Sequence, residues 1–286
     1  MYAATVWETL RQEYHHHLCA QVVRLDAQNR PNNADKSSRL STAIARALWQ
    51  FVAQRTGCTF DHTSLPPQSV GKAFEAATRD YLQRAFATLR HLRPGRWRFY
   101  LNHRIEEFAQ YRHLAELSRT LREHPTLHAA LGDYLIAPDI LIAREPVPDE
   151  EINISALLVE GRDLAGYTSL RAVNNETPLL HASVSCKWTI RSDRSQNVRT
   201  EGLNLIRNRK GHTPHIAVVT AEPLPGRLAS LTLGTGDLDM VYHIALPELI
   251  QAVEQIGDES AQDLLATMIS GQRLRDISDL PFDLAA

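Results

Sequence analysis

The order of strand and helix patterns in the second half of the chain most limits how this sequence can fold. Residues 179–191 and 215–223 are apolar strand-like segments, and residues 196–210 between them repeat apolar positions at helical spacing. A further apolar run at 241–246 extends the series. Strands that alternate with helices at this spacing form one layered α/β sheet. We therefore expect a central mixed β-sheet flanked by helices.

The first half of the chain has a different period. Residues 41–57 and 72–92 place apolar side chains at helical intervals, the first ending at Gly57 and the second forming a continuous apolar stripe. Near residue 134 the period changes to that of a strand or bent strand pair, in "YLIAPDILIAR". We expect one domain over 1–286, with residues 1–130 mainly helical and residues 131–286 forming the α/β core.

Composition excludes several classes of protein. The chain has 286 residues and 43% of them are hydrophobic, which is enough for a sizeable core. Its 31 basic and 33 acidic residues nearly cancel, so any nucleic-acid site must be a local patch. No apolar run approaches the roughly 18 residues needed to cross a bilayer, and no signal peptide precedes the first helix. Three cysteines argue against a disulfide framework and for a reducing compartment, so we expect a cytoplasmic protein without membrane contact.

A run of three histidines, His15 to His17, lies in the first helical segment. Consecutive helical positions point about 100° apart, so these three rings cannot converge on one metal ion. We interpret the run as a solvated helix face.

An acid and a lysine stand at the ends of two neighbouring strand segments. Asp139 follows Pro138 at the interruption of one strand, and Lys187 lies in the next. Carboxylate oxygens hold Mg²⁺, and a lysine can position water and stabilise charge on phosphorus, so this pair suits metal-assisted phosphodiester hydrolysis. Such a pair also occurs by chance in many chains, so the pair alone remains a hypothesis.

The usual form of this nuclease pattern has a second acid two residues before the lysine. Here that position is Ser185, which carries no carboxylate. Glu201, in the helix that follows the strand, is one candidate for the missing charge, and Glu75, in the long helix before it, is another. The simpler interpretation of both is a surface glutamate.

Three charged residues follow the lysine strand directly: Arg191, Asp193 and Arg194. Arginine binds O6 and N7 of guanine with two hydrogen bonds, and aspartate accepts from N4 of cytosine, so the triplet has the chemistry to read G·C pairs. The alternative is a helix start whose charges lie in water. Arg199, Arg207, Arg209 and Lys210 could supply contacts to phosphate.

Four segments together resemble a known family. They are "PLLHASVSCKWTIRSDR", "EGLNLIRNRKG", "PHIAVVTAEP" and "RLRDISDLPFDLA". They resemble type IIF restriction endonucleases of the NgoMIV type, within the PD-(D/E)xK nuclease superfamily. The resemblance implies a restriction-endonuclease-like core and Mg²⁺-dependent cleavage of double-stranded DNA at GCCGGC, after the first G. It also implies a homotetramer that engages two sites, and a cognate DNA methyltransferase that protects the host.

The resemblance also assigns roles to the catalytic residues. Asp139 matches the family's metal-binding aspartate, and Lys187 matches its catalytic lysine. Glu201 matches the acid displaced onto the helix, and Glu75 an additional glutamate. Cys186 would offer its main-chain carbonyl to the metal.

Further positions match residues that contact DNA in the family. Arg191, Asp193 and Arg194 match the readers of the inner CCGG. Three others fall where the family contacts the outer base pair and the minor groove: Asp35, Gln68 and Arg227.

Two other functions are compatible with parts of the pattern. A structure-selective repair or recombination nuclease of the same superfamily would need Asp139 and Lys187 but not the charged triplet. A DNA-binding regulator without catalysis would keep the triplet, but the intact Asp139, Lys187 and Glu201 speak against it.

Overall fold

One six-stranded mixed sheet forms the centre of the molecule, in a computed structural model that describes residues 4–126, 129, 137–234 and 236–286. Its strands lie in chain order, with antiparallel pairing from β1 to β3 and parallel pairing from β3 to β6. The expected mixed sheet is confirmed. The strands are β1 (Trp97–Leu101), β2 (Ile140–Arg144), β3 (Leu179–Lys187), β4 (His215–Thr220), β5 (Met240–His243) and β6 (Leu274–Asp276).

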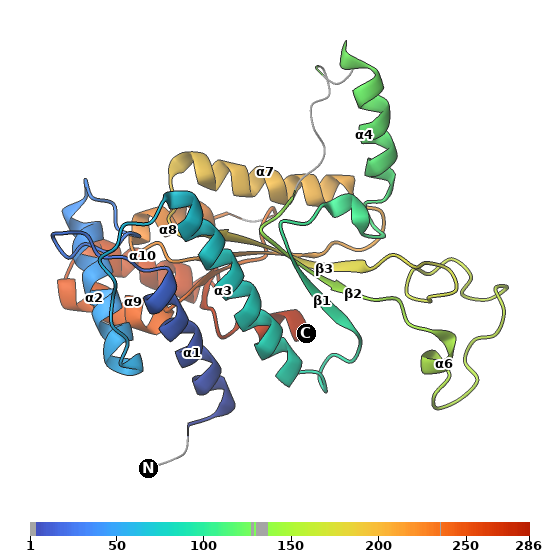
Figure 1. The fold of residues 1–286 in the computed structure, drawn as a ribbon, viewed down its shortest axis with the longest axis horizontal. Helices are drawn as coiled ribbons and strands as arrows, with labels where there is room; N and C mark the ends of the chain where they lie inside the picture. Colours follow the sequence, from blue (N-terminus) through green and yellow to red (C-terminus); the bar gives the residue numbers. More distant parts are fainter. Residues whose placement is uncertain (1–3, 127–128, 130–136, 235) are drawn as a thin grey trace.

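Helices cover the sheet, and Figure 1 shows α3 crossing it. Helix α7 connects β3 to β4, and α8 lies between β4 and β5 in the chain. Helix α3 contacts β1 and β3, α1 packs on α3, α2 packs on α9, and α8 contacts β5. No helix in the described part of the chain is long and apolar enough to cross a membrane. The helices are α1 (Val6–Gln21), α2 (Arg39–Thr56), α3 (Pro67–Thr88), the 3₁₀ helix η1 (Ile105–Glu107), α4 (His113–Glu123), α6 (Asp149–Ile152), α7 (Ser192–Asn208), α8 (Pro225–Thr232), α9 (Leu246–Ile256), α10 (Glu259–Ser270) and α11 (Leu280–Ala285).

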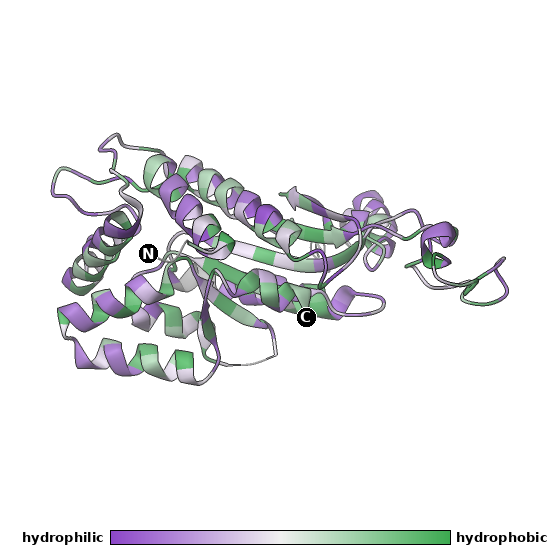
Figure 2. Ribbon diagram, turned by 90° about the horizontal axis from the view of Figure 1, so that it is seen from below, coloured by the Kyte–Doolittle hydropathy of each residue, from purple (hydrophilic) through white to green (hydrophobic). Residues whose placement is uncertain are grey.

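The central strands are buried on both faces because helices cover both. Every residue of β3 between its two ends is buried, and β2 is buried up to its last residue. Figure 2 shows apolar and intermediate colours along the strands of the sheet, and polar colour on parts of the surrounding helices. The sequence of β2 is continuously apolar up to Arg144, as expected of a strand that is covered on both faces. In β3, buried polar side chains such as Ser183 and Ser185 alternate with apolar ones such as Val184.

The sequence predicts most of these elements but not all. Helix α2 ends at Gly57 in the left-handed conformation, at a φ of 69°, as predicted for a glycine that ends a helix. Two short strands, β1 and β6, were not predicted. The predicted strand at 134–144 is described from residue 140, and residues 134–136 lie outside the described part of the chain.

His15 is buried, so the interpretation of the histidine run as a solvated face is wrong for this residue. Its Nε2 atom lies 2.7 Å from the carbonyl oxygen of Ile244, just after β5. Burial lowers the pKa of His15 to about 4, so the ring is neutral near pH 7. His16, one position on, is exposed. The three consecutive histidines alone do not indicate which of them packs against another part of the chain.

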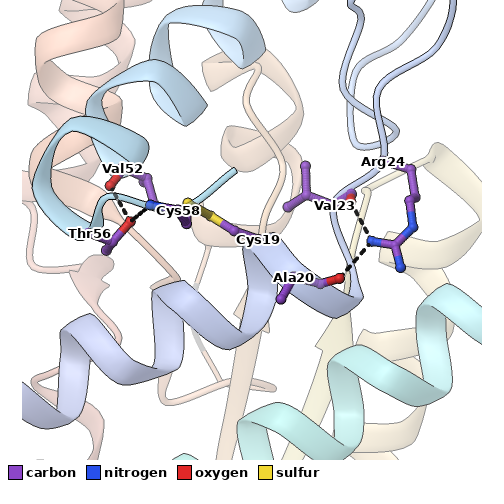
Figure 3. Close-up of a disulfide and its surroundings, with 7 residues drawn as sticks. All are labelled: Cys19, Ala20, Val23, Arg24, Val52, Thr56 and Cys58. Carbon is purple, nitrogen blue, oxygen red and sulfur yellow. Dashed lines mark hydrogen bonds between the residues drawn. A yellow bond between two sulfur atoms is a disulfide. The ribbon is translucent and has the colours of Figure 1, made fainter. Parts of the chain in front are cut away.

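A disulfide joins Cys19, near the end of α1, to Cys58, just after α2, with the two Cα atoms 6.2 Å apart (Figure 3). The three cysteines led us to expect no disulfide framework and a reducing compartment, and this bond was not predicted. Cys186 is free and buried. The bond links the end of α1 to the end of α2, and the cysteine in β3 takes no part in it.

The connection between β2 and β3 forms an arm, residues 145–178, that projects away from the body of the molecule (Figure 1). Arg171 is buried inside it, donating to both carboxylate oxygens of Asp149 and to the carbonyl oxygens of Gly161 and Leu164. The surface of the arm exposes several large apolar side chains: Ile154, Leu157, Leu158, Leu164 and Tyr167.

Candidate active site

The start of β2 and the end of β3 lie side by side because these two strands are antiparallel. This pairing brings Asp139 and Lys187 together, as their positions in the sequence suggested. The Oδ2 atom of Asp139 accepts a hydrogen bond from Nζ of Lys187 at 2.8 Å and another from the main-chain N–H of Cys186 at 2.7 Å. The carboxylate is therefore oriented by two donors from the neighbouring strand.

Glu201 reaches the same point from α7. Its Oε2 atom accepts a hydrogen bond from Oγ of Ser185, at 3.2 Å. Helix α7 packs closely at Gly202, where an added Cβ would stand 2.4 Å from the carbonyl oxygen of Asp237, in the loop before β5, and 3.4 Å from the Ile216 side chain of β4. The helix thus brings a carboxylate to the strand position that holds a serine.

Glu75 approaches from α3 on the other side. Nδ2 of Asn102 donates to Oε2 of Glu75 at 3.2 Å, and the main-chain N–H of Asn102 donates to the carbonyl oxygen of Asp139 at 3.1 Å. Asn102 follows β1 and has a positive φ of 47°, a conformation that asparagine tolerates better than most residues. Asn102 was not predicted, although asparagine after a strand is a usable signal.

The three carboxylates share one ammonium group. Burial, and then the charge of Asp139, raise the pKa of Glu75 above its usual range. Burial also raises the pKa of Glu201. For Lys187 burial acts in the lowering direction, but Asp139 and Glu201 outweigh it and raise the pKa. The site therefore holds more negative charge than its own lysine neutralises.

The oxygen donors fit a hard divalent cation. Mg²⁺ in enzymes uses one or two carboxylates and keeps several waters or substrate oxygens. Asp139, Glu201 and the carbonyl of Cys186 form such a set, and burial raises the pKa of the Cys186 thiol, which keeps it protonated. Within residues 4–126, 129, 137–234 and 236–286, no three His, Cys, Asp or Glu side chains converge as a preformed metal cage.

A cleft of about 910 Å³ opens over these residues. Its lining includes all the predicted catalytic residues together with Arg191, Asp35 and Arg227. Four residues with basic side chains line it as well: Arg24, Arg30, Lys36 and His62. Asp26 also lines the cleft and pairs with Arg30 and Lys36. These basic side chains can contact a phosphate backbone, although acids balance part of their charge.

The predicted DNA readers are distributed over three segments. Arg191 precedes α7 and is exposed, and its side chain does not cap that helix. Asp35 and Arg227 form an ion pair across the cleft. Gln68 is exposed in the first turn of α3, outside the cleft lining.

Asp193 and Arg194 fall in the first turn of α7, where the side chains lie outside the described part of the chain. Their predicted reading of the inner base pairs stays a prediction.

Glu222 is a buried acid that was not predicted. Its Oε2 atom accepts from the main-chain N–H of Ile190 at 2.8 Å, and its Oε1 atom accepts from that of Leu224 at 3.1 Å. Burial raises the pKa of Glu222 to about 7, although the two N–H groups and Arg227 act in the opposite direction. The only signal in the sequence was an acid two residues after the strand β4.

A mixed sheet that brings an aspartate, a lysine and a displaced glutamate together in one cleft is the arrangement expected of a nuclease of the restriction-endonuclease class. The chain belongs to the NgoMIV restriction enzyme family, whose model matches residues 14–286. The type II restriction enzyme NgoMIV from Neisseria gonorrhoeae is 50% identical to it over 260 residues, which is 89% of each chain.

Two solved structures of restriction endonucleases align with the chain as well. Bse634I with cognate DNA is a type IIF enzyme that is 12% identical, with a TM-score of 0.38, over 88% of this chain and 92% of its own. The complex of PspGI with substrate DNA is 13% identical, with a TM-score of 0.30, over 98% of this chain and 92% of its own.

Membership of this family makes the protein a type II restriction endonuclease, a site-specific deoxyribonuclease. The alternatives of a structure-selective repair nuclease and of a regulator without catalysis are set aside on this finding.

Proposed function

We propose that the enzyme cleaves double-stranded DNA at GCCGGC after the first G, with Mg²⁺ as cofactor, and leaves a 5′ CCGG overhang. The observation that carries the proposal is the contact of Asp139 with Lys187 beside Glu201, in the cleft that Arg191 also lines. The 50% identity to NgoMIV supports the same specificity.

Each residue of the site has a distinct chemical task in this proposal. Asp139, Glu201 and the carbonyl of Cys186 would hold Mg²⁺, which supplies positive charge beside the scissile phosphate and acidifies water. Lys187, oriented by Asp139, holds the attacking water and stabilises the charge that develops on phosphorus. Glu75 adds negative charge that favours binding of the cation. Attack in line with the leaving 3′ oxygen gives 3′-hydroxyl and 5′-phosphate ends.

Recognition uses the residues beyond the catalytic strand. Arg191, Asp193 and Arg194 read the inner CCGG through guanine O6 and N7 and cytosine N4. The outer base pair and the minor groove are contacted by Asp35, Gln68 and Arg227.

The exposed apolar side chains of the arm support assembly into a homotetramer. Ile154 is 85% exposed and Tyr167 fully exposed, and large apolar side chains exposed together on one projection are typical of an interaction site. In this proposal the partner of the arm is a second copy of the chain. The enzyme works in the cytoplasm, where a cognate methyltransferase protects the host DNA.

Digestion of a sequenced plasmid in the presence of Mg²⁺, followed by sequencing of the product ends, tests the proposal. All ends should map to GCCGGC with the stated overhang, and EDTA should stop the reaction. Ends at another sequence would overturn the specificity, and cleavage in EDTA would overturn the cofactor.

Comparison of plasmids with one and two GCCGGC sites tests the assembly. On a plasmid with two sites the second binding event is intramolecular, so cleavage should be faster than on a plasmid with one site. A short GCCGGC duplex added in trans should accelerate the slow reaction. Equal rates without stimulation, together with a dimer mass in solution, would contradict the tetramer.

A further inference from the structure

A short buried segment after β4 is tied to the end of the catalytic strand. Oγ1 of Thr220 donates to the carbonyl oxygen of Lys187 at 2.7 Å and accepts from the main-chain N–H of Glu222 at 3.1 Å. Thr220 and Glu222 are both completely buried. The position of the segment is therefore fixed relative to Lys187 by hydrogen bonds that water does not reach.

The Glu222 carboxylate extends this connection to two cleft-lining arginines. Its bond to the N–H of Ile190 holds the residue immediately before Arg191, and its bond to the N–H of Leu224 holds the residue immediately before α8. Arg227 lies in the first turn of α8, with Nη1 3.9 Å from Oε2 of Glu222. One side chain thus supports the main chain next to both arginines.

The loop that carries Asp35 is attached to the same segment. Nδ2 of Asn33, which is completely buried, donates to the carbonyl oxygen of Ala221 at 2.7 Å. Asp35 itself pairs with Arg227. The loop that carries Asp35 is therefore attached at Ala221, one residue before Glu222, and the start of the helix that carries Arg227 is attached to Glu222 itself through Leu224.

We propose that Glu222 is a positioning residue that fixes the distance between the readers of the inner and the outer base pairs. The inference rests on the proposed function, which gives Arg191 the inner pairs and Arg227 the outer pair. A carboxylate is needed because both of its oxygens accept from main-chain N–H groups. An amide has one acceptor oxygen and would turn an NH₂ group toward the second N–H. The chain next to one of the two arginines would then lose its support, and the spacing between them would change.

Glu222→Gln is the test variant, and its affinity is measured for three duplexes in EDTA at one fixed salt concentration. The duplexes are GCCGGC, ACCGGT with the outer pair changed, and GCATGC with inner pairs changed. Wild type should discriminate against both changed duplexes. Glu222→Gln should lose about 10- to 100-fold of discrimination against each of them, the size of one base contact. Arg191→Ala should lose only the inner discrimination, and Arg227→Ala only the outer.

Glu248→Gln is the matched control, because Glu248 is also a completely buried glutamate but lies at α9, paired with Arg11 and Arg55. It should lower the melting temperature while leaving both discrimination ratios unchanged. If Glu222→Gln is insoluble, Glu222→Asp keeps the charge, shortens the reach and is judged by the same ratios. Wild-type ratios in the Glu222 variant, or a loss at one position alone, would overturn the coupling. If the wild-type enzyme binds all three duplexes equally well, the proposed function itself is overturned.

Discussion

Two buried groups of carboxylates in this molecule differ in how their charge is balanced. In the first, which we call the Arg11 network, Arg11 contacts Glu248 at 2.7 Å and Asp276 at 2.8 Å, and Arg55 contacts Glu248 at 2.6 Å. Burial acts to raise the pKa of Glu248 and of Asp276, but Arg11 outweighs it and both pKa values are lowered. Two acids contact two arginines, so the charges within the network balance without any further group.

The active site has the opposite balance. Asp139, Glu75 and Glu201 share Lys187, and the pKa values of both glutamates are raised. Burying like charges without enough compensation costs stability, and the Mg²⁺ ion of the proposed function would supply the missing positive charge here. The comparison distinguishes a structural ion network from a catalytic one by the direction of the pKa shifts, although both are buried and rich in acids.

Removal of Lys187, which donates to Asp139, should have the largest effect. Lys187→Ala should lower single-turnover cleavage by about 100- to 10,000-fold, because the attacking water loses its positioned partner. Affinity for GCCGGC in EDTA should stay near that of wild type, because Lys187 reads no base. Cleavage at the wild-type rate by the purified variant would remove the active-site assignment.

The displaced acid gives the next largest effect. Glu201→Ala should slow cleavage and raise the Mg²⁺ concentration needed for it, by about 10- to 100-fold, at least as much as loss of an outer-shell partner. Ser185→Glu in the same chain should recover part of the rate, because the Ser185 hydroxyl already contacts Glu201. Full activity in Glu201→Ala would place the acid elsewhere, with Glu75 the next candidate.

A substitution in the Arg11 network should change the free energy of unfolding and not the rate of cleavage. Arg11→Ala should lower the free energy of unfolding by about 3–5 kcal/mol, because it leaves buried carboxylates without their partner. The matched control is Arg84→Ala, which removes an exposed pair with Glu13 and should cost about 1 kcal/mol or less. Denaturant titration measures both. Equal losses in the two variants would show that the network does not depend on Arg11.

Acid should weaken the same network. The pKa values of Glu248 and Asp276 are lower in the folded protein than in the unfolded chain, so their contribution is fully present above the unfolded values of roughly 4. It is lost as the pH falls through the lowered folded values. Arg11→Ala should therefore lose less stability on acidification than wild type does, measured by unfolding at a series of pH values. A steeper loss in the variant would contradict this sign.

The smallest expected effect is that of Gly202→Ala. The added methyl group would stand 2.4 Å from the carbonyl oxygen of Asp237, so α7 must shift and carry Glu201 with it, at a cost of about 1–3 kcal/mol. Cleavage should slow while Lys187 and Asp139 stay in contact. Gly226→Ala is the control, because a methyl group there meets no atom within 4 Å. An unchanged cleavage rate for Gly202→Ala would separate the position of α7 from catalysis.

The position of the catalytic pair could be predicted because it depends on local features. Asp139 precedes one buried strand and Lys187 ends the next, so antiparallel pairing alone brings them together. Glu201 could be predicted as one of two candidates, because a helix that follows a strand packs back on the sheet.

Other parts of the site depend on tertiary contacts that no local pattern encodes. Asn102 reaches Glu75 only because β1, five residues long and partly exposed, pairs at the edge of the sheet. Glu222 is buried only because the loops after β3 and β4 meet. His15 was misjudged for the same reason, since the end of β5 and not its own helix covers it.

The arm has a consequence for how this enzyme can vary. It is inserted between Arg144 and Leu179, which face each other as register partners at the ends of β2 and β3. Antiparallel strands can be joined by a turn of two residues, so the fold does not need residues 145–178 to close the ribbon. The catalytic residues lie at the opposite end of the same two strands. Insertions, deletions or exchanges in the arm can therefore alter the surface that we propose joins copies of the chain, while the register that aligns Asp139 with Lys187 is inherited unchanged.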